Sequence, residues 1–197
     1  MPETRSLFEN IANVYDPLNS LFSLGMHKKW KSKLVRNFLL SNSLLDIATG
    51  TSDVSIEFIK QNGSAYACGL DPSLNMLMKS QDKIQKLNYQ KNIHLINGYA
   101  EELPFSDESF DAVSISFGIR NTLDPHCSLK EMNRVLKPGG KIGILEFSLP
   151  VHKIFGPAYM YYLNYFFPFP KPLLISSILT PSVARAIVSR LLSDPCK

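Results

Sequence analysis

A chain of 197 residues, 45% hydrophobic and 19% charged, has the composition of one globular domain, which excludes extensive disorder. Its formal net charge of +4 is mild, and its one basic cluster, at 28–36, has the spacing of a solvated helix face, so we expect no nucleic-acid partner. Three widely spaced cysteines predict neither a disulfide framework nor a metal site, and they fit a reducing cytoplasm.

The first forty residues are predicted to form helices. They carry no apolar leader, so no signal peptide is expected. Apolar residues from Phe8 to Tyr15 have helical spacing, Pro17 interrupts it, and a second helix is expected over 18–40. We therefore predict an N-terminal helical cap at 1–40.

Beyond residue 40, short apolar runs alternate with amphipathic segments. Strands are predicted over 44–47, 65–70, 93–96, 110–116 and 141–147, and helices over 53–60, 74–87 and 125–136. This alternation predicts an α/β fold with a doubly wound, mostly parallel, Rossmann-like sheet, which binds its ligands beyond the carboxyl ends of the strands. The uncharged stretch 154–170 contains prolines and is too short for a clean membrane-spanning helix.

Two carboxylates end the first two predicted strands. Asp46 precedes a turn of alternating small residues, Asp46-x-Ala48-x-Gly50-x-Ser52, and Asp71 follows 25 positions later. Asp46 would repel a pyrophosphate, and the glycine spacing of dinucleotide sites is absent. S-adenosylmethionine instead carries an ammonium, a sulfonium and a ribose whose two hydroxyls can donate hydrogen bonds to Asp71. The pair therefore favours this cofactor, although each acid taken alone also fits a turn cap.

Two further segments follow the third and fourth predicted strands. The loop at 99–105 is expected to cover the adenine, with a plain surface loop as the alternative. The segment at 116–121 is expected to face the reacting methyl group, and it carries Arg120, for which a surface ion pair is the alternative. Together these features predict a single domain over 1–197, with a cofactor-binding core at 41–150 and an aromatic, apolar segment at 151–197.

With these pieces assembled, the chain resembles the demethylmenaquinone methyltransferase / 2-methoxy-6-polyprenyl-1,4-benzoquinol methylase family of S-adenosylmethionine-dependent enzymes. The resemblance runs from about residue 6 to about residue 169. The matching pieces are Phe8-x-x-Ile11-Ala12-x-x-Tyr15-Asp16-x-x-Asn19, Ser23-Leu24-Gly25-Met26-His27-x-x-Trp30, the Asp46 turn, Ala100-Glu101-x-Leu103-Pro104-Phe105, Ser116-Phe117-Gly118-Ile119-Arg120-Asn121, Arg134-Val135-Leu136-Lys137-Pro138-Gly139-Gly140 and Leu145-Glu146-Phe147-Ser148.

The resemblance implies C-methylation of a prenylated quinol, from demethylmenaquinol to menaquinol, with a methoxy-polyprenyl-benzoquinol as a further substrate. It implies a cytoplasmic enzyme peripheral to the inner face of the membrane and leaves a homodimer open. Arg120 is the expected stabiliser of the ionised ring oxygen, and His27 is a candidate base or else a packed helix histidine. The expected cofactor-binding residues are Asp46, Gly50, Thr51, Asp71, Tyr99, Ala100 and Ser116, and no metal is expected.

The chain departs from the family at three places. Ser52 replaces the usual glycine of the turn, and Tyr99 replaces an Asn or Asp that would bond the adenine amino group. After Phe169 the family pattern stops, so its terminal antiparallel strand pair is expected to be missing. These departures keep two alternatives open, an inactive cofactor-binding accessory protein and a methyltransferase of another small molecule. A nicotinamide dehydrogenase is the weakest option.

Overall fold

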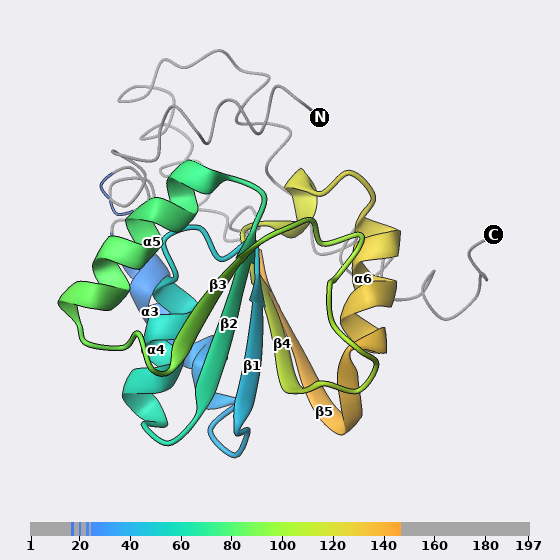
Figure 1. Ribbon diagram of the computed structural model, residues 1–197, viewed down its shortest axis with the longest axis horizontal. Coiled ribbons are helices and arrows are strands. Elements are labelled where there is room, and N and C mark those ends of the chain that lie inside the picture. Colours follow the sequence, from blue (N-terminus) through green and yellow to red (C-terminus); the bar gives the residue numbers. More distant parts are fainter. Residues whose placement is uncertain (1–16, 18–19, 21–22, 24, 147–197) are drawn as a thin grey trace, which may run out of the picture. The chain divides into compact units, whose positions relative to one another are not determined.

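The fold is known from a computed structural model that describes Pro17, Ser20, Ser23 and residues 25–146 (Figure 1). All described helices and strands belong to the first of two units, residues 1–145 and 146–197. The first predicted helix, the aromatic segment and the expected loss of the strand pair lie outside the described residues. No helix in the described part of the chain is long and apolar enough to cross a membrane. The elements are α3 (Met26–Arg36), β1 (Ser43–Ile47), α4 (Asp53–Gln61), β2 (Tyr66–Asp71), α5 (Leu74–Lys86), β3 (Ile93–Asn97), β4 (Phe110–Ser116), η1 (Ile119–Asn121), α6 (Pro125–Arg134) and β5 (Leu136–Leu145).

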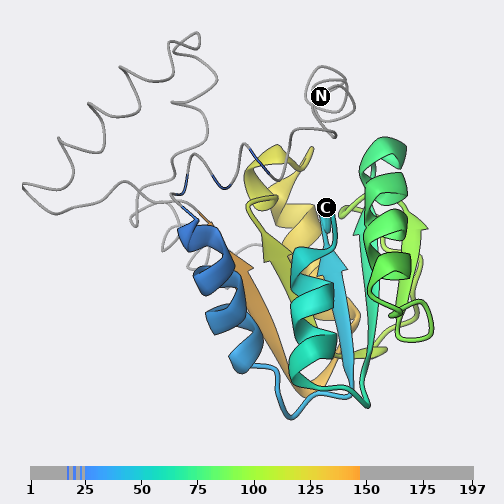
Figure 2. The same cartoon turned by 90° about the vertical axis from the view of Figure 1, so that its left-hand side faces the viewer.

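The five strands form one parallel sheet in the order β3-β2-β1-β4-β5, which confirms the predicted fold class. The chain runs outward from β1 through β2 to β3, then returns to place β4 on the other side of β1. Helices α4 and α5 therefore cover one face of the sheet and α6 the other (Figures 1 and 2). The reversal between β1 and β4 opens a crevice at their carboxyl ends, where such sheets bind ligands.

Helix α3 lies against α4 and β5 because a glycine lets it approach the sheet. A Cβ at Gly143 would lie 2.6 Å from Cδ1 of Leu34 on α3 and 2.5 Å from Cζ of Phe38, which is buried in the core. The helix starts later than the expected 18–40 segment. Gly25, just before Met26, has φ of +75°, a left-handed conformation that separates α3 from the residues before it.

One carboxylate joins three helices on this face. Asp53, the first residue of α4, accepts from Lys31 of α3 at 2.8 Å and from Lys83 of α5. Although burial opposes it, the charges of the two ammonium groups hold the pKa of Asp53 well below its usual value. Lys31 is 9% exposed, so the expected solvated face at 28–36 is wrong at this position, while Lys28 and Lys29 are exposed.

Strand β4 bonds to both ends of β1. At the amino end, Oδ2 of Asp111 accepts from the backbone N–H groups of Asn42 and Ser43, both at 3.0 Å, and from Oγ of Ser43 at 2.9 Å. At the carboxyl end, Oγ of Ser114 donates to Oδ1 of Asp46 at 2.8 Å. These side-chain bonds fix the register of the two strands that flank the crevice.

Strand β5 begins five residues before its predicted start at 141. Leu136 pairs with Phe110, and regular pairing resumes with Lys141 opposite Ala112. The residues between them form a bulge, in which Gly139 has φ of +77°. The turn predicted at Pro138 and Gly139 was expected to come before the strand. It instead lies inside β5, where it interrupts the pairing with β4.

Candidate functional site

A pocket lies at the carboxyl ends of β1 to β4, in the crevice that the topology predicts. Its empty space, counted together with the open mouth, is about 840 Å³. Every wall comes from a segment that follows a strand or from the strand's last residues. The lining residues are Ile47, Ala48, Gly50, Leu70, Asp71, Pro72, Ser73, Met76, Tyr99, Ala100, Glu101, Ser116, Phe117, Gly118, Asn121, Thr122 and Leu123.

The turn after β1 has a left-handed residue at every second position. The φ angles of Ala48, Gly50 and Ser52 are +51°, +55° and +59°. Only the glycine adopts this conformation freely, and each of the other two residues costs about 1 kcal/mol or more. Buried hydroxyls compensate at Ser52, whose Oγ lies 3.2 Å from Oγ1 of Thr49 and contacts Oγ of Ser80. The serine that departs from the family's glycine is thus held by bonds that glycine cannot make.

Asp46 organises this turn from inside the protein. Its Oδ2 accepts from Oγ1 of Thr49 at 2.7 Å and from Oγ of Ser55 at 3.0 Å, and its Oδ1 accepts from Ser114. Burial raises the pKa of Asp46 against the effect of the three hydroxyls. Gly69, opposite Asp46 on β2, leaves the necessary space, since a Cβ there would lie 2.9 Å from Cγ2 of Thr49.

Asp71 links the turn to the end of β2 and lines the pocket. Its Oδ2 accepts from the N–H of Gly50 at 2.8 Å, and its Oδ1 accepts from the N–H of Ser73 at 2.9 Å. Each oxygen keeps a second acceptor position. Burial, together with the charge of Asp46, raises the pKa of Asp71 to about 6 against these two N–H groups. The arrangement is a fixed, buried acceptor suited to two hydroxyl donors.

The opposite wall is formed by the end of β4. Oγ of Ser116, the last residue of β4, is buried and has no hydrogen-bond partner in the described part of the chain. Gly118 packs against the turn after β1, because a Cβ there would lie 2.5 Å from Cβ of Ala48. The two walls therefore meet in direct contact, and a buried hydroxyl lies beside the junction.

The structure brings together five of the nine residues expected in the site. Gly50, Asp71, Tyr99, Ala100 and Ser116 all line the pocket. Asp46 and Thr51 are buried behind the wall, and Arg120 is in η1, next to the lining residue Asn121. His27 is on α3, 2% exposed, and its Nδ1 lies 2.7 Å from Oγ of Ser23. Neither Arg120 nor His27 is among the residues that line the pocket.

Several lining residues were not predicted to be part of the site. Met76 could have been found, because it lies three positions after the predicted N-cap Ser73, on the helix that follows Asp71. Leu123 and Thr122 follow η1, whose turn the apolar pattern does not reveal. Glu101 accepts from the N–H groups of Leu123 and Asp124, which are 22 and 23 residues away, so no local pattern could have indicated this contact.

Curated relatives share this sequence over most of its length. A demethylmenaquinone methyltransferase of Staphylococcus haemolyticus is 41% identical over 169 residues, which are 84% of this chain and 70% of the relative. The protein of the same name from Bacillus subtilis is 43% identical over 166 residues, 83% of this chain and 71% of the relative. A ubiquinone/menaquinone biosynthesis C-methyltransferase of Geobacter sp. is 43% identical over 161 residues, 80% of this chain and 68% of the relative.

Solved structures share the fold. A protein of Methanococcus maripaludis, assigned as an S-adenosyl-L-methionine-dependent methyltransferase, aligns with a TM-score of 0.73 and 20% identity over 93% of this chain and 82% of its own. A SAM-dependent methyltransferase of Aquifex aeolicus aligns with a TM-score of 0.56 and 21% identity over 62% of this chain and 66% of its own. The model of the ubiE/COQ5 methyltransferase family matches residues 3–179. The predicted resemblance is confirmed: this chain belongs to the ubiE/COQ5 methyltransferase family.

Proposed function

We propose that this methyltransferase binds S-adenosylmethionine in the pocket and methylates a ring carbon of a prenylated quinol. The observation that carries the proposal is Asp71, a buried carboxylate fixed by two backbone N–H groups at the carboxyl edge of the sheet. Family membership supports methyl transfer. The names of the relatives, demethylmenaquinone methyltransferase and ubiquinone/menaquinone biosynthesis C-methyltransferase, support a quinol as the acceptor.

The residues of the pocket fit this cofactor. Asp71 offers acceptor positions for the two ribose hydroxyls, and Oγ of Ser116 is a buried polar atom that a ligand would satisfy. Ala100 and Tyr99 would border the adenine, the former through its backbone. Asp46 acts behind the wall by holding the turn that presents the N–H of Gly50 to Asp71. When bound, S-adenosylmethionine supplies an electrophilic methyl group on a sulfonium.

The chain's own contribution to the reaction is to orient the acceptor and to stabilise charge. A ring carbon becomes nucleophilic when the adjacent hydroxyl loses its proton, which costs roughly 4 kcal/mol at pH 7 for a phenol of pKa about 10. Arg120 is in η1, after the lining residue Gly118, so its guanidinium is our candidate to stabilise the ring oxygen anion while water takes the proton. Holding the ring carbon in line with the methyl group lowers the barrier further.

The mouth of the pocket suits an apolar chain attached to the quinol. Leu123 lines the pocket and is 63% exposed, and Leu74, beside the lining residue Ser73, is 53% exposed. Exposed apolar side chains around a pocket are typical of surfaces that take up an apolar ligand or contact lipid. They support a prenylated substrate and a peripheral position at the inner membrane face.

The proposal is tested by two measurements on the full chain. Calorimetric titration should show binding of S-adenosylmethionine and none of NADH, and methyl transfer to demethylmenaquinol should follow. Arg120→Ala should bind the cofactor as the wild type does but lose turnover by about a hundredfold or more, while Arg120→Lys keeps part of it because a cation remains. Binding without turnover of any quinol would favour the accessory alternative, and full turnover by Arg120→Ala would overturn the role of the guanidinium.

A second prediction concerns the contact between the two pocket walls. Gly118→Ala should weaken cofactor binding about tenfold or more, because the new Cβ would overlap that of Ala48 and push the turn after β1 away from β4. Ala48→Gly removes the obstructing atom and relaxes a left-handed residue. The double variant should therefore recover most of the affinity, as calorimetry would measure.

Gly63→Ala is the matched control for this pair, since a Cβ at Gly63 would have no atom within 4 Å. Its affinity should equal that of the wild type. If Gly118→Ala binds the cofactor normally, the walls do not need the contact, and if Ala48→Gly fails to rescue it, the overlap with Ala48 is not the cause.

A further inference from the structure

Glu101 connects two walls of the pocket that are far apart in the sequence. It lies in the loop after β3 and lines the pocket, as does Leu123 in the segment between η1 and α6. Its Oε1 accepts from the N–H of Leu123 at 2.6 Å and from the N–H of Asp124 at 3.2 Å. In addition, Sγ of Cys127 donates to the backbone oxygen of Glu101 at 3.4 Å. One carboxylate oxygen of Glu101 thus connects the loop after β3 to the segment between η1 and α6.

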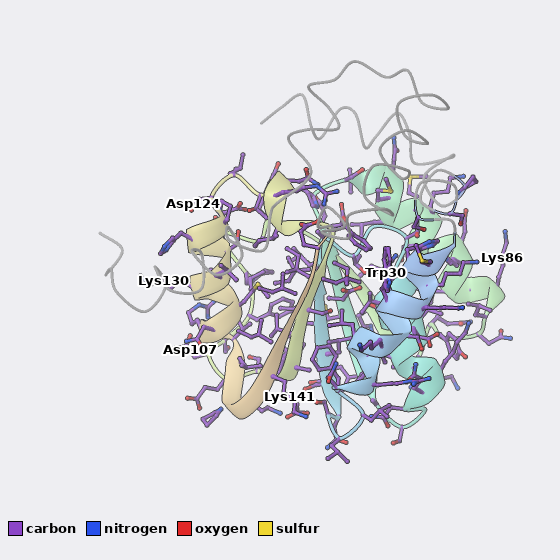
Figure 3. All side chains as sticks on the ribbon, turned by 180° about the vertical axis from the view of Figure 1, so that it is seen from behind. Trp30, Lys86, Asp107, Asp124, Lys130 and Lys141 are labelled. Atoms are coloured by element: carbon purple, nitrogen blue, oxygen red, sulfur yellow. The ribbon has the colours of Figure 1, made fainter. Side chains whose placement is uncertain are left out.

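The rest of the same loop is bonded to the far end of α6. The N–H of Leu103 donates to Oε2 of Glu131 at 2.9 Å. The guanidinium of Arg134 donates to the backbone oxygens of Leu103 and Phe105 at 3.0 and 2.8 Å. The loop therefore follows α6 along its length (Figure 1), from the end marked by Asp124 to the end near Asp107, both labelled in Figure 3.

We infer that Glu101 is a positioning residue that couples the wall beside the cofactor's base to the wall beside the acceptor. The inference rests on the proposed function, which places Tyr99 and Ala100 beside the adenine, and Arg120 and Leu123 on the side of the acceptor. Ordering either wall on its ligand orders the other through the carboxylate of Glu101. Binding of the cofactor thereby prepares the acceptor side, and binding of the quinol strengthens cofactor binding by the same factor.

The chemistry of this bridge separates its role from that of an ordinary surface acid. Both N–H groups bond to the same oxygen, so a side-chain amide oxygen at this position can replace it. Without an acceptor the two donors turn to water and the segment at 122–124 loses its connection to the loop. The length of the side chain and its acceptor oxygen therefore matter more than its negative charge. For this reason Glu101→Gln and Glu101→Ala have different expected results.

The test compares Glu101→Ala, Glu101→Gln and Glu102→Ala with the wild type. Glu102 is the adjacent exposed acid and does not line the pocket, so it is the matched control. In Glu101→Ala we expect the dissociation constant for S-adenosylmethionine and the KM for demethylmenaquinol each to rise about tenfold, equal to 1.4 kcal/mol, while kcat stays close to the wild-type value. Glu101→Gln and Glu102→Ala should bind both ligands nearly as the wild type does.

Amide hydrogen exchange gives a second readout that needs no ligand. The N–H groups of Leu123 and Asp124 should exchange slowly in the wild type and in Glu101→Gln, and much faster in Glu101→Ala. Unchanged ligand affinities in Glu101→Ala, or unprotected amides in the wild type, would overturn the inference while leaving the proposed function intact. A wild type that binds no S-adenosylmethionine would overturn the proposed function and the coupling with it, whatever the exchange of the two amides.

Discussion

Asp71→Ala is expected to abolish measurable binding of S-adenosylmethionine. In the proposed complex each oxygen of Asp71 accepts one ribose hydroxyl, and hydrogen bonds to a charged group contribute about 1.5–3 kcal/mol each. Losing two of them lowers the affinity by roughly a hundredfold or more, since every 1.4 kcal/mol is a factor of ten. Calorimetric titration of the purified variant measures the loss directly.

Two variants show whether the carboxylate itself is responsible. Asp71→Glu keeps the charge and should keep detectable binding, whereas Asp82→Ala removes an exposed acid from α5, outside the pocket, and should change nothing. Asp71 also bonds to the N–H groups of Gly50 and Ser73, so circular dichroism must establish that Asp71→Ala is folded. A folded Asp71→Ala that binds the cofactor normally would remove the ribose assignment.

The same carboxylate predicts how binding depends on pH. Burial raises the pKa of Asp71 to about 6, so the group is ionised above that pH and neutral below it. The ionised form is the stronger acceptor, so affinity should be constant above about pH 7 and fall as the pH drops through 6, by up to about tenfold for each unit. Titrations of the wild type between pH 5 and 8 would show this step, and Asp71→Asn should lack it.

The largest effect on stability is expected from Asp46→Ala. The substitution leaves the hydroxyls of Thr49, Ser55 and Ser114 without their shared acceptor, and an unsatisfied buried donor costs about 1–3 kcal/mol. Removing the carboxylate also ends the cost of burying it, which is the cause of its raised pKa, so the net loss is smaller than the sum of three bonds. We expect the free energy of unfolding to fall by about 3 kcal/mol in urea denaturation.

Two further variants separate the contribution of the Asp46 carboxylate to stability from that of the hydroxyls that donate to it. Ser114→Ala removes one donor and leaves Asp46 two others, so it should cost only about 1 kcal/mol. Asp46→Asn keeps one acceptor oxygen and should fall between the two. An Asp46→Ala variant as stable as the wild type would mean that the cost of burying the carboxylate equals everything its three bonds contribute.

Much of the fold follows from local sequence patterns. β4 has the predicted bounds, because its alternating apolar run is closed by Gly118 at one end and follows polar turn residues at the other. Ser73 accepts from the N–H of Met76 at 3.4 Å, as a predicted helix cap should. The predicted starts of α3 and β5 were wrong, because backbone conformation determines both. The left-handed Gly25 precedes α3, and a bulge extends β5 back to Leu136.

The site was predictable only where one segment determines it. Asp71 and Gly50 were predicted because Asp71 ends β2 and Gly50 lies in the turn after β1, and a parallel sheet brings such strand ends to one edge. The bonds of Asp46 were not predictable, because its donors are 3, 9 and 68 positions away, on different elements. Similarly, the hydrogen bond from Leu123 to Glu101 depends on how two loops pack, and the sequence pattern of neither loop predicts that packing.

The bonds from β4 to both ends of β1 also bear on how the chain folds as it is made. Asp111 and Ser114 leave the ribosome 68 residues after their partners Ser43 and Asp46. Until then β1 can pair with β2, but Oδ1 of Asp46 lacks its donor Ser114, and the N–H of Ser43 lacks its acceptor Asp111. Such distant contacts raise the contact order and slow folding. A nascent chain that stalls before residue 110 would therefore expose an incomplete apolar sheet and depend on chaperones.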